Sequence, residues 1–172
     1  VIAADESFRN VTEALAERYV AHYPETKLHL KFQKEDYALM DLLKRNVRVI
    51  VMSRELTEKE KKLYEEMVDL PLKPAKFAGD AVVFVVAKDS PKNSISVQEI
   101  KKELQSDEKN IIFDGVNASN FNFVAQKLNL APQKIKYSLI KGNKGIVEQI
   151  SKFPNSIGVI SLNTISNPYS RE

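Results

Sequence analysis

Apolar residues gather in short runs along this chain, and stretches with helical spacing separate most of these runs. The clearest run covers residues 81–87, where seven apolar residues follow Gly79-Asp80 and precede Lys88-Asp89-Ser90-Pro91. A short apolar run bounded by turn-forming residues is typical of a strand buried on both faces of a parallel sheet. We therefore expect residues 81–87 to form a buried strand that carries the chain from one α/β lobe into a second.

The residues before this run predict three strands that alternate with three helices. Strands are expected at 1–4, 27–32 and 47–51, and helices at 8–23, 37–45 and 57–69. Residues 27–32 alternate between polar and apolar side chains, as a strand with one buried face does. Thr57 and Glu60 have the spacing of a capping box, which marks the start of the third helix.

The residues after the central run repeat the same alternation. Helices are expected at 96–104, 121–128 and around 146–150, strands at 110–113 and 156–161, and a turn at 142–145. Ser96 and Glu99 have the spacing of a second capping box. The pattern predicts an α/β protein with two lobes, residues 1–79 and 80–162, each a mostly parallel sheet flanked by helices. Residues 163–172 are expected to be a tail or the start of a return to the first lobe.

Composition narrows the functional classes. The 172 residues carry a net charge of only +3, with both signs interleaved, so nothing indicates nucleic-acid binding. No apolar run approaches the roughly 18–20 residues of a membrane span. The chain has no cysteine, which excludes disulfides and a thiol nucleophile, and only two histidines, His22 and His29. We expect neither a metal site nor a cofactor.

Three junctions share one design, in which a strand ends, small polar residues follow, and a helix begins. They are Asp5-Glu6-Ser7, Met52-Ser53-Arg54 and Asn117-Ala118-Ser119. Ligands of α/β sheets bind outside the carboxyl ends of the strands, where helix N-termini offer N–H groups to an anion. The alternative is that these serines are only helix caps or turn residues, since serine is favoured there anyway.

Two pairs of acids also allow both a functional and a structural interpretation. Asp5-Glu6 and Glu35-Asp36 could converge as a general acid/base pair or as a cation site. They could equally be solvated acids or helix caps, because their spacing is not diagnostic. The sequence therefore does not indicate an enzyme.

The ordered set of segments resembles a known family. The chain is similar to the phosphate-binding periplasmic proteins of ABC phosphate transporters, the PstS-like branch of the type II solute-binding superfamily. The likeness rests on five segments: 4–8 (Ala-Asp-Glu-Ser-Phe), 49–56 with Glu58 and Glu60, 78–86, 97–101 and 153–160.

The resemblance implies a two-lobed periplasmic-binding-protein-like fold (type II) and a solute-binding function. Such a protein holds a small anion, with phosphate as the first candidate, in the cleft between its lobes and delivers it to an ABC transporter permease. It is a monomer, is not an enzyme, and is periplasmic or exported, with a lipid anchor before Val1 as one option. The ligand-binding residues implied here are Ser7, Ser53, Arg54, Asn117, Ala118 and Ser119.

The chain departs from this family at two loops. Residues 33–37 (Gln-Lys-Glu-Asp-Tyr) replace a Gly-Ser-Gly-like loop, and residues 114–119 lack the Arg and the Gly of an Arg…Ser-Gly-Thr loop. Asp5, Glu6 and Asp36 are expected to be acidic cleft residues, which would oppose a dianion electrostatically. They could instead hold a proton and accept a hydrogen bond from a monoprotonated oxyanion, or pair with a cationic ligand.

The acidic residues at these loops favour a second hypothesis, an interaction or scaffold module on the same fold that has lost phosphate binding. A third hypothesis is a hydrolase with Asp5 or Glu35 as its base. The sequence ends soon after Ile160, so we also expect the family's C-terminal return segment to be absent.

Overall fold

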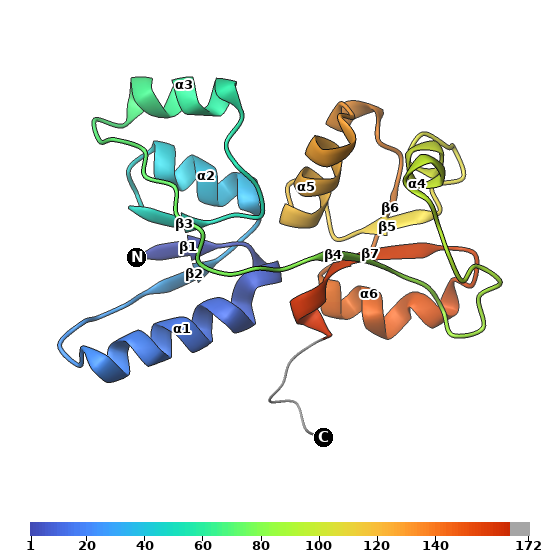
Figure 1. Cartoon of the computed structure of the whole chain (residues 1–172), viewed down its shortest axis with the longest axis horizontal. Coiled ribbons are helices and arrows are strands. Elements are labelled where there is room, and N and C mark those ends of the chain that lie inside the picture. The colour runs from blue at the N-terminus through green and yellow to red at the C-terminus, as the bar shows by residue number, and fades with distance from the viewer. Residues whose placement is uncertain (166–172) are drawn as a thin grey trace. The chain divides into compact units, whose positions relative to one another are not determined.

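The structure, a computed structural model, describes residues 1–165. The chain divides into two compact units, unit 1 (Val1–Gly79) and unit 2 (from Asp80 onward). Each has its own sheet, with helices on both faces (Figure 1). The expected return segment or tail, 163–172, lies largely outside the described residues.

The sheet of unit 1 has three parallel strands. They are β1 (Ile2–Ala4), β2 (Leu30–Phe32) and β3 (Val49–Val51), in the order β2-β1-β3. Ala4 is in register with Phe32 on one side and with Val51 on the other. All three strands therefore end at the same edge, and the residues that follow them meet there.

Helices cover both faces of this sheet. A 3₁₀ turn (Glu6–Phe8) leads into α1 (Arg9–His22) on one face, whereas α2 (Glu35–Leu43) and α3 (Glu58–Met67) lie on the other (Figure 1). The apolar core on the α2 side comprises Ala3, Ala38, Leu39, Leu42, Leu43, Val47, Tyr64 and Val68. A smaller cluster on the α1 side comprises Ala4, Phe8 and Val51.

The sheet of unit 2 is mixed. It contains β4 (Val82–Val85), β5 (Ile111–Phe113), β6 (Ser138–Leu139) and β7 (Ile157–Ser161), in the order β4-β7-β5-β6. The strand β5 is parallel to both of its neighbours, whereas β4 is antiparallel to β7. The carboxyl ends of β5, β6 and β7 therefore share one edge.

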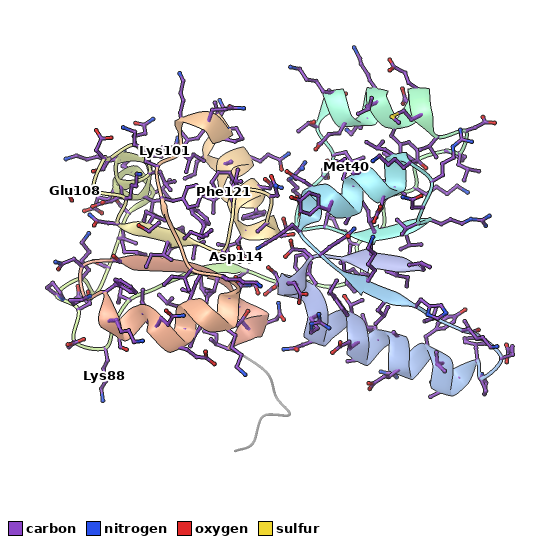
Figure 2. All side chains as sticks on the ribbon, turned by 180° about the vertical axis from the view of Figure 1, so that it is seen from behind. Met40, Lys88, Lys101, Glu108, Asp114 and Phe121 are labelled. Carbon is purple, nitrogen blue, oxygen red and sulfur yellow. The ribbon has the colours of Figure 1, made fainter. Side chains whose placement is uncertain are left out.

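Helices also cover both faces of the second sheet. The helices α4 (Val97–Glu103) and α5 (Ser119–Leu128) lie on one face and α6 (Asn143–Gln149) on the other (Figure 1). Three 3₁₀ turns complete the unit, Pro132–Lys134, Ile150–Lys152 and Leu162–Thr164. Phe121 is fully buried against Phe113, with ring centroids 5.2 Å apart, while Lys101 and Glu108 extend from the surface (Figure 2).

The α/β class and the parallel-dominated sheets confirm the expected fold class. The expectation for residues 81–87 is wrong in one respect, because β4 is a half-buried edge strand that runs antiparallel to β7. An edge strand has a neighbouring strand on one side only, so its side chains are less enclosed than those of a central strand, even when they are apolar. Apolar content alone cannot distinguish this position from a central one.

Other expectations are confirmed or corrected element by element. Both capping boxes are present, at Thr57 and at Ser96. The expected turn at 142–145 is wrong beyond its first residue, since α6 begins at Asn143. The two-residue strand β6 was not predicted, because both of its side chains are exposed and leave no apolar pattern.

Candidate functional site

Polar residues follow each of the three strands of unit 1 at their shared edge. Asp5 comes directly after β1, Glu35 opens α2 after β2, and Ser53-Arg54 come after β3. These residues are far apart in sequence but are joined by hydrogen bonds. The edge is the position at which α/β sheets bind ligands.

The carboxylate of Asp5 lies at the start of two helical segments. Its Oδ1 accepts a hydrogen bond of 2.9 Å from the backbone N–H of Ser7, and its Oδ2 accepts one of 2.9 Å from the backbone N–H of Glu35. Asp5 is fully buried. It therefore caps the 3₁₀ turn that follows it and also α2, whose own N-cap residue, Lys34, supplies no side-chain cap.

The carboxylate of Glu35 is bound on both of its oxygens. Its Oε2 accepts from the backbone N–H and from the hydroxyl of Ser53, both at 3.0 Å, and its Oε1 accepts from Nε of Arg54 at 2.9 Å. The side chain of Glu35 is 0% exposed and that of Arg54 is 7% exposed. This is a buried ion pair with additional neutral donors, the arrangement that a buried carboxylate requires.

Arg54 is held on its other edge by Glu60. Its Nη1 and Nη2 each donate to one oxygen of that carboxylate at 2.8 Å, in a bidentate pair. Burial alone would lower the pKa of Arg54, but Glu60 and Glu35 outweigh it and raise that pKa, so Arg54 is cationic. Burial alone would raise the pKa of Glu60, but hydrogen bonds from Arg54 and Thr57 lower it to about 2.

The edge of unit 1 thus contains the donors that an oxyanion site uses, namely backbone N–H groups, a hydroxyl and a guanidinium. Each of these donors contacts a carboxylate of the protein itself. We refer to Asp5, Glu35, Ser53, Arg54 and Glu60 as the carboxylate network.

In unit 2 the corresponding edge carries a group of amide and hydroxyl side chains. Nδ2 of Asn120, on α5, donates to Oδ1 of Asn143 at 2.9 Å, and Nδ2 of Asn143 donates to the hydroxyl of Ser161 at 3.3 Å. All three residues are buried, as is Ser119. Amides and hydroxyls can both donate and accept hydrogen bonds, so this edge can contact a polar group of either kind.

The buried carboxylate of Asp114 follows β5 at the same edge of unit 2 (Figure 2). Gly115 comes next with φ of 135°, a conformation that favours glycine. Ala118 is the N-cap of α5 and offers no side-chain acceptor to its first turn. Asn117 is half-buried in the intervening loop.

The residues predicted from sequence are placed in different ways. Ser7, Ser53 and Arg54 meet at the edge of unit 1, and Asn117, Ala118 and Ser119 lie where β5 leads into α5. Glu6 does not join the carboxylate network, because its carboxylate is exposed and pairs with Arg9. Asp36 lies half-buried in the first turn of α2.

Several residues of these edges were not among the predicted ligand-binding residues. Glu35 was considered as one acid of an uncertain pair and as the base of a hydrolase, and Asn120, Asn143 and Ser161 were not considered. Asn120 could have been found from its position beside Ser119 at the start of a helix. No local pattern indicates the contact between Asn143 and Ser161, because these residues are 18 positions apart in the sequence.

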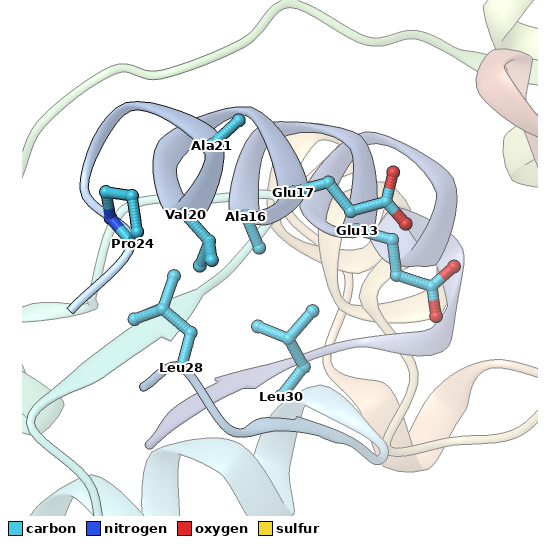
Figure 3. A pocket seen from close by; sticks show the side chains of 8 residues that line it. All are labelled: Glu13, Ala16, Glu17, Val20, Ala21, Pro24, Leu28 and Leu30. Carbon is cyan, nitrogen blue, oxygen red and sulfur yellow. The ribbon is translucent and has the colours of Figure 1, made fainter. Parts of the chain in front are cut away.

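A cavity of about 620 Å³ lies elsewhere in unit 1, beside α1 and β2 (Figure 3). Its lining residues are Glu13, Ala16, Glu17, Val20, Ala21, Pro24, Leu28 and Leu30. The wall is mainly aliphatic, and none of the predicted site residues lies in it. It therefore has no part in the site at the strand ends.

Comparison with known proteins identifies the family. The sequence profile of the PBP superfamily domain matches residues 1–172, the full length of the chain. The chain belongs to the PBP superfamily. The resemblance inferred from the five sequence segments is thereby confirmed at the level of family and fold.

Solved structures share the fold at low sequence identity. One is a Clostridium perfringens protein assigned as a phosphate ABC transporter substrate-binding protein and solved with bound phosphate. It is 16% identical, with a TM-score of 0.79 over 94% of this chain and 70% of the other. An ABC-type phosphate transport receptor from Vibrio cholerae is also 16% identical, with a TM-score of 0.69 over 95% of this chain and 71% of the other.

A third neighbour has a different role. The CcmR regulatory domain from Synechocystis, solved in complex with 2-PG, is 14% identical, with a TM-score of 0.61 over 99% of this chain and 75% of the other. No curated protein sequence matches the chain. The PBP fold thus occurs in proteins with different ligands, and at these identities the likeness shows the fold alone.

Two further findings concern residues 1–165. In this part of the chain no three His, Asp or Glu side chains are grouped so that they could hold a metal ion. No helix in the same range combines the length and the apolar character needed to cross a bilayer.

Proposed function

We propose that this chain is a solute-binding domain that holds a small polar ligand at the carboxyl ends of its strands. The observation that carries the proposal is the collection of buried polar side chains at that edge in both units, in a chain of the PBP superfamily. Binding, rather than catalysis, is the proposed activity. Following the resemblance, we further propose that the protein is a monomer, acts in a periplasmic or exported setting and delivers its solute to an ABC transporter permease.

The ligand is proposed from the chemistry of the two edges. Phosphate is the first oxyanion to test, because the resemblance implies it. The carboxylate network argues against a dianion at unit 1, since Glu35 and Asp5 already accept from its donors. The amides and hydroxyls of unit 2 suit a neutral or singly charged polar solute, with Ser119, Asn120 and Asn143 as the proposed contacts.

A thermal-shift and calorimetric survey of the intact chain tests this proposal. It compares phosphate, sulfate and other oxyanions with neutral polar solutes and cationic metabolites. A ligand at 100 times its dissociation constant stabilises the folded state by about 2.7 kcal/mol, which is several degrees for a chain of this size. A saturable shift with any of these compounds supports a solute-binding domain, and Asn120→Ala should then weaken binding of that compound.

A second candidate function is an interaction or scaffold module on the same fold. The carboxylate network favours this candidate, because its hydrogen-bond donors already contact carboxylates of the protein rather than a solute. The absence of any shift across the survey, from a well-folded sample, would contradict solute binding and leave this candidate.

A further inference from the structure

We propose that the carboxylates of Glu35 and Asp5 take the place of a bound oxyanion in unit 1, so that Glu35 is the residue that excludes phosphate from this edge. The inference refines the ligand class of the solute site proposed above. Its test compares variants of unit 1 with the wild type and does not require the natural ligand to be known, so the two proposals can fail separately.

The number and kind of donors around Glu35 carry this inference. One carboxylate receives a backbone N–H, a hydroxyl and a guanidinium N–H within 3.0 Å. Protein sites for phosphate and carboxylate ligands combine these same groups, because charge-assisted hydrogen bonds are among the stronger ones. Glu35 is completely buried, so its carboxylate is enclosed as a ligand would be.

Asp5 extends the same arrangement to the start of α2. The nine-residue helix α2 presents the N–H of its first residue, Glu35, to Oδ2 of Asp5. A helix N-terminus attracts negative charge through its free N–H groups and its dipole. Here a carboxylate that lies 30 residues earlier in the chain supplies that charge.

The carboxylates of this network also outnumber its guanidinium. Arg54 faces Glu35 through Nε at 2.9 Å and Glu60 through both of its Nη atoms at 2.8 Å. An entering dianion would therefore meet three carboxylates and one guanidinium, a net charge of −2 from Asp5, Glu35, Glu60 and Arg54. Like charges at this range repel strongly in a partly buried site.

Removing the Glu35 carboxylate should turn this arrangement into an open anion site. The variant Glu35→Ala keeps Ser53 and Arg54 and creates space for a carboxylate and one methylene group, because alanine retains the Cβ atom. A small free oxyanion can then restore the lost hydrogen bonds. Acetate and inorganic phosphate are the two probes, and chloride at matched ionic strength is the reference.

Two variants are matched to Glu35→Ala. Leu42→Ala, on the same helix, loses apolar core contacts but exposes no anion donor. Glu35→Gln removes the charge but keeps the side-chain volume, so it leaves no room for a probe. Asp5→Ala loses only a carboxylate and is a second opened site, tested with formate in case Glu35→Ala does not fold.

The readout is the midpoint temperature as a function of probe concentration. We expect Glu35→Ala to gain a saturable rise of a few degrees with acetate, phosphate or both, relative to chloride. The wild type, Leu42→Ala and Glu35→Gln should show no saturable rise. A response to acetate alone would indicate a site shaped for a monocarboxylate, and a response to phosphate would indicate a tetrahedral one.

Two results would overturn the inference. One is a response of Glu35→Ala, or of Asp5→Ala if the first variant does not fold, that does not exceed that of Leu42→Ala. The other is a saturable phosphate shift in the wild type that persists with equal size in Glu35→Ala, because Glu35 would then exclude nothing.

Discussion

At the residue scale, the defining feature of this protein is a buried ion pair that is supported by neutral donors. Glu35 and Arg54 lose nearly all contact with water, which costs several kcal/mol per ion unless partners replace it. Ser53 and Glu60 provide those partners. Removing one member of such a pair leaves a buried charge without compensation, which typically costs about 3–5 kcal/mol.

Glu60 makes this network sensitive to acid. Its pKa in the folded protein is about 2, compared with an ordinary value of 4.5. Because the folded-state pKa is the lower of the two, the stabilisation is complete above about pH 4.5 and is lost as the pH falls toward 2. In urea unfolding from pH 7 to pH 2, the difference in free energy of unfolding between wild type and Glu60→Gln should therefore shrink below about pH 4.5.

Glu58→Gln is the matched control for this prediction. Glu58 lies on the same helix with a side chain that is 83% exposed, and it pairs only with Lys61 among the ion pairs of the described residues. Its unfolding free energy should follow that of the wild type at every pH. A gap between wild type and Glu60→Gln that stays constant down to pH 2 would contradict the assigned pKa.

At the element scale, close packing of α6 on β7 depends on one glycine. A Cβ added to Gly158, in β7, would lie 2.5 Å from Cγ2 of Ile146 and 3.0 Å from Cγ2 of Val85. Gly158→Ala should destabilise the protein by about 1–3 kcal/mol through overpacking, measured by urea unfolding followed by circular dichroism.

Gly145 provides the comparison on α6 itself. A Cβ there would lie 3.6 Å from Cγ2 of Ile140, an ordinary contact. Gly145→Ala should stabilise by about 0.4–1 kcal/mol, because alanine loses less backbone entropy on folding. If both substitutions had the same sign, the packing assigned to β7 and α6 would be wrong.

Local sequence patterns predicted much of the fold. The capping boxes at Thr57 and Ser96 are contacts over three residues, and both are present as expected. The edge position of β4 could not be predicted, because it depends on pairing with residues 158–161, far along the chain. The composition of a strand indicates how far its side chains are buried. It does not indicate which strands pair with it, because that depends on the topology of the sheet.

The site was less predictable than the fold for the same reason. Helix-start patterns located Ser7, Ser53 and Ser119 at strand ends. The partners of Glu35 lie 18 and 19 residues away, and the donor from α2 to Asp5 lies 30 residues away. Contacts over such distances leave no local pattern in the sequence. The sequence therefore indicated that acids lie near the site, but not that they accept hydrogen bonds from its N–H and hydroxyl groups.

At the scale of the whole molecule, two units with separate cores present different chemistry at their strand ends. Unit 1 carries charged residues that are bound to one another, and unit 2 carries buried amides and hydroxyls together with the buried carboxylate of Asp114. Solved structures that share this fold carry different ligands, phosphate in one and 2-PG in another. The central claim is that this chain keeps the fold while its own carboxylates fill the anion donors of unit 1.

Amide NMR of the intact chain during titration with inorganic phosphate tests this claim most directly. The resonances of Ser7, Glu35 and Ser53 report the three backbone N–H groups that contact Asp5 and Glu35. We predict that they shift no more with phosphate, up to tens of millimolar, than with chloride at equal ionic strength. A saturable shift of all three with one dissociation constant would contradict the claim, because phosphate would then be reaching donors that the carboxylates are said to fill.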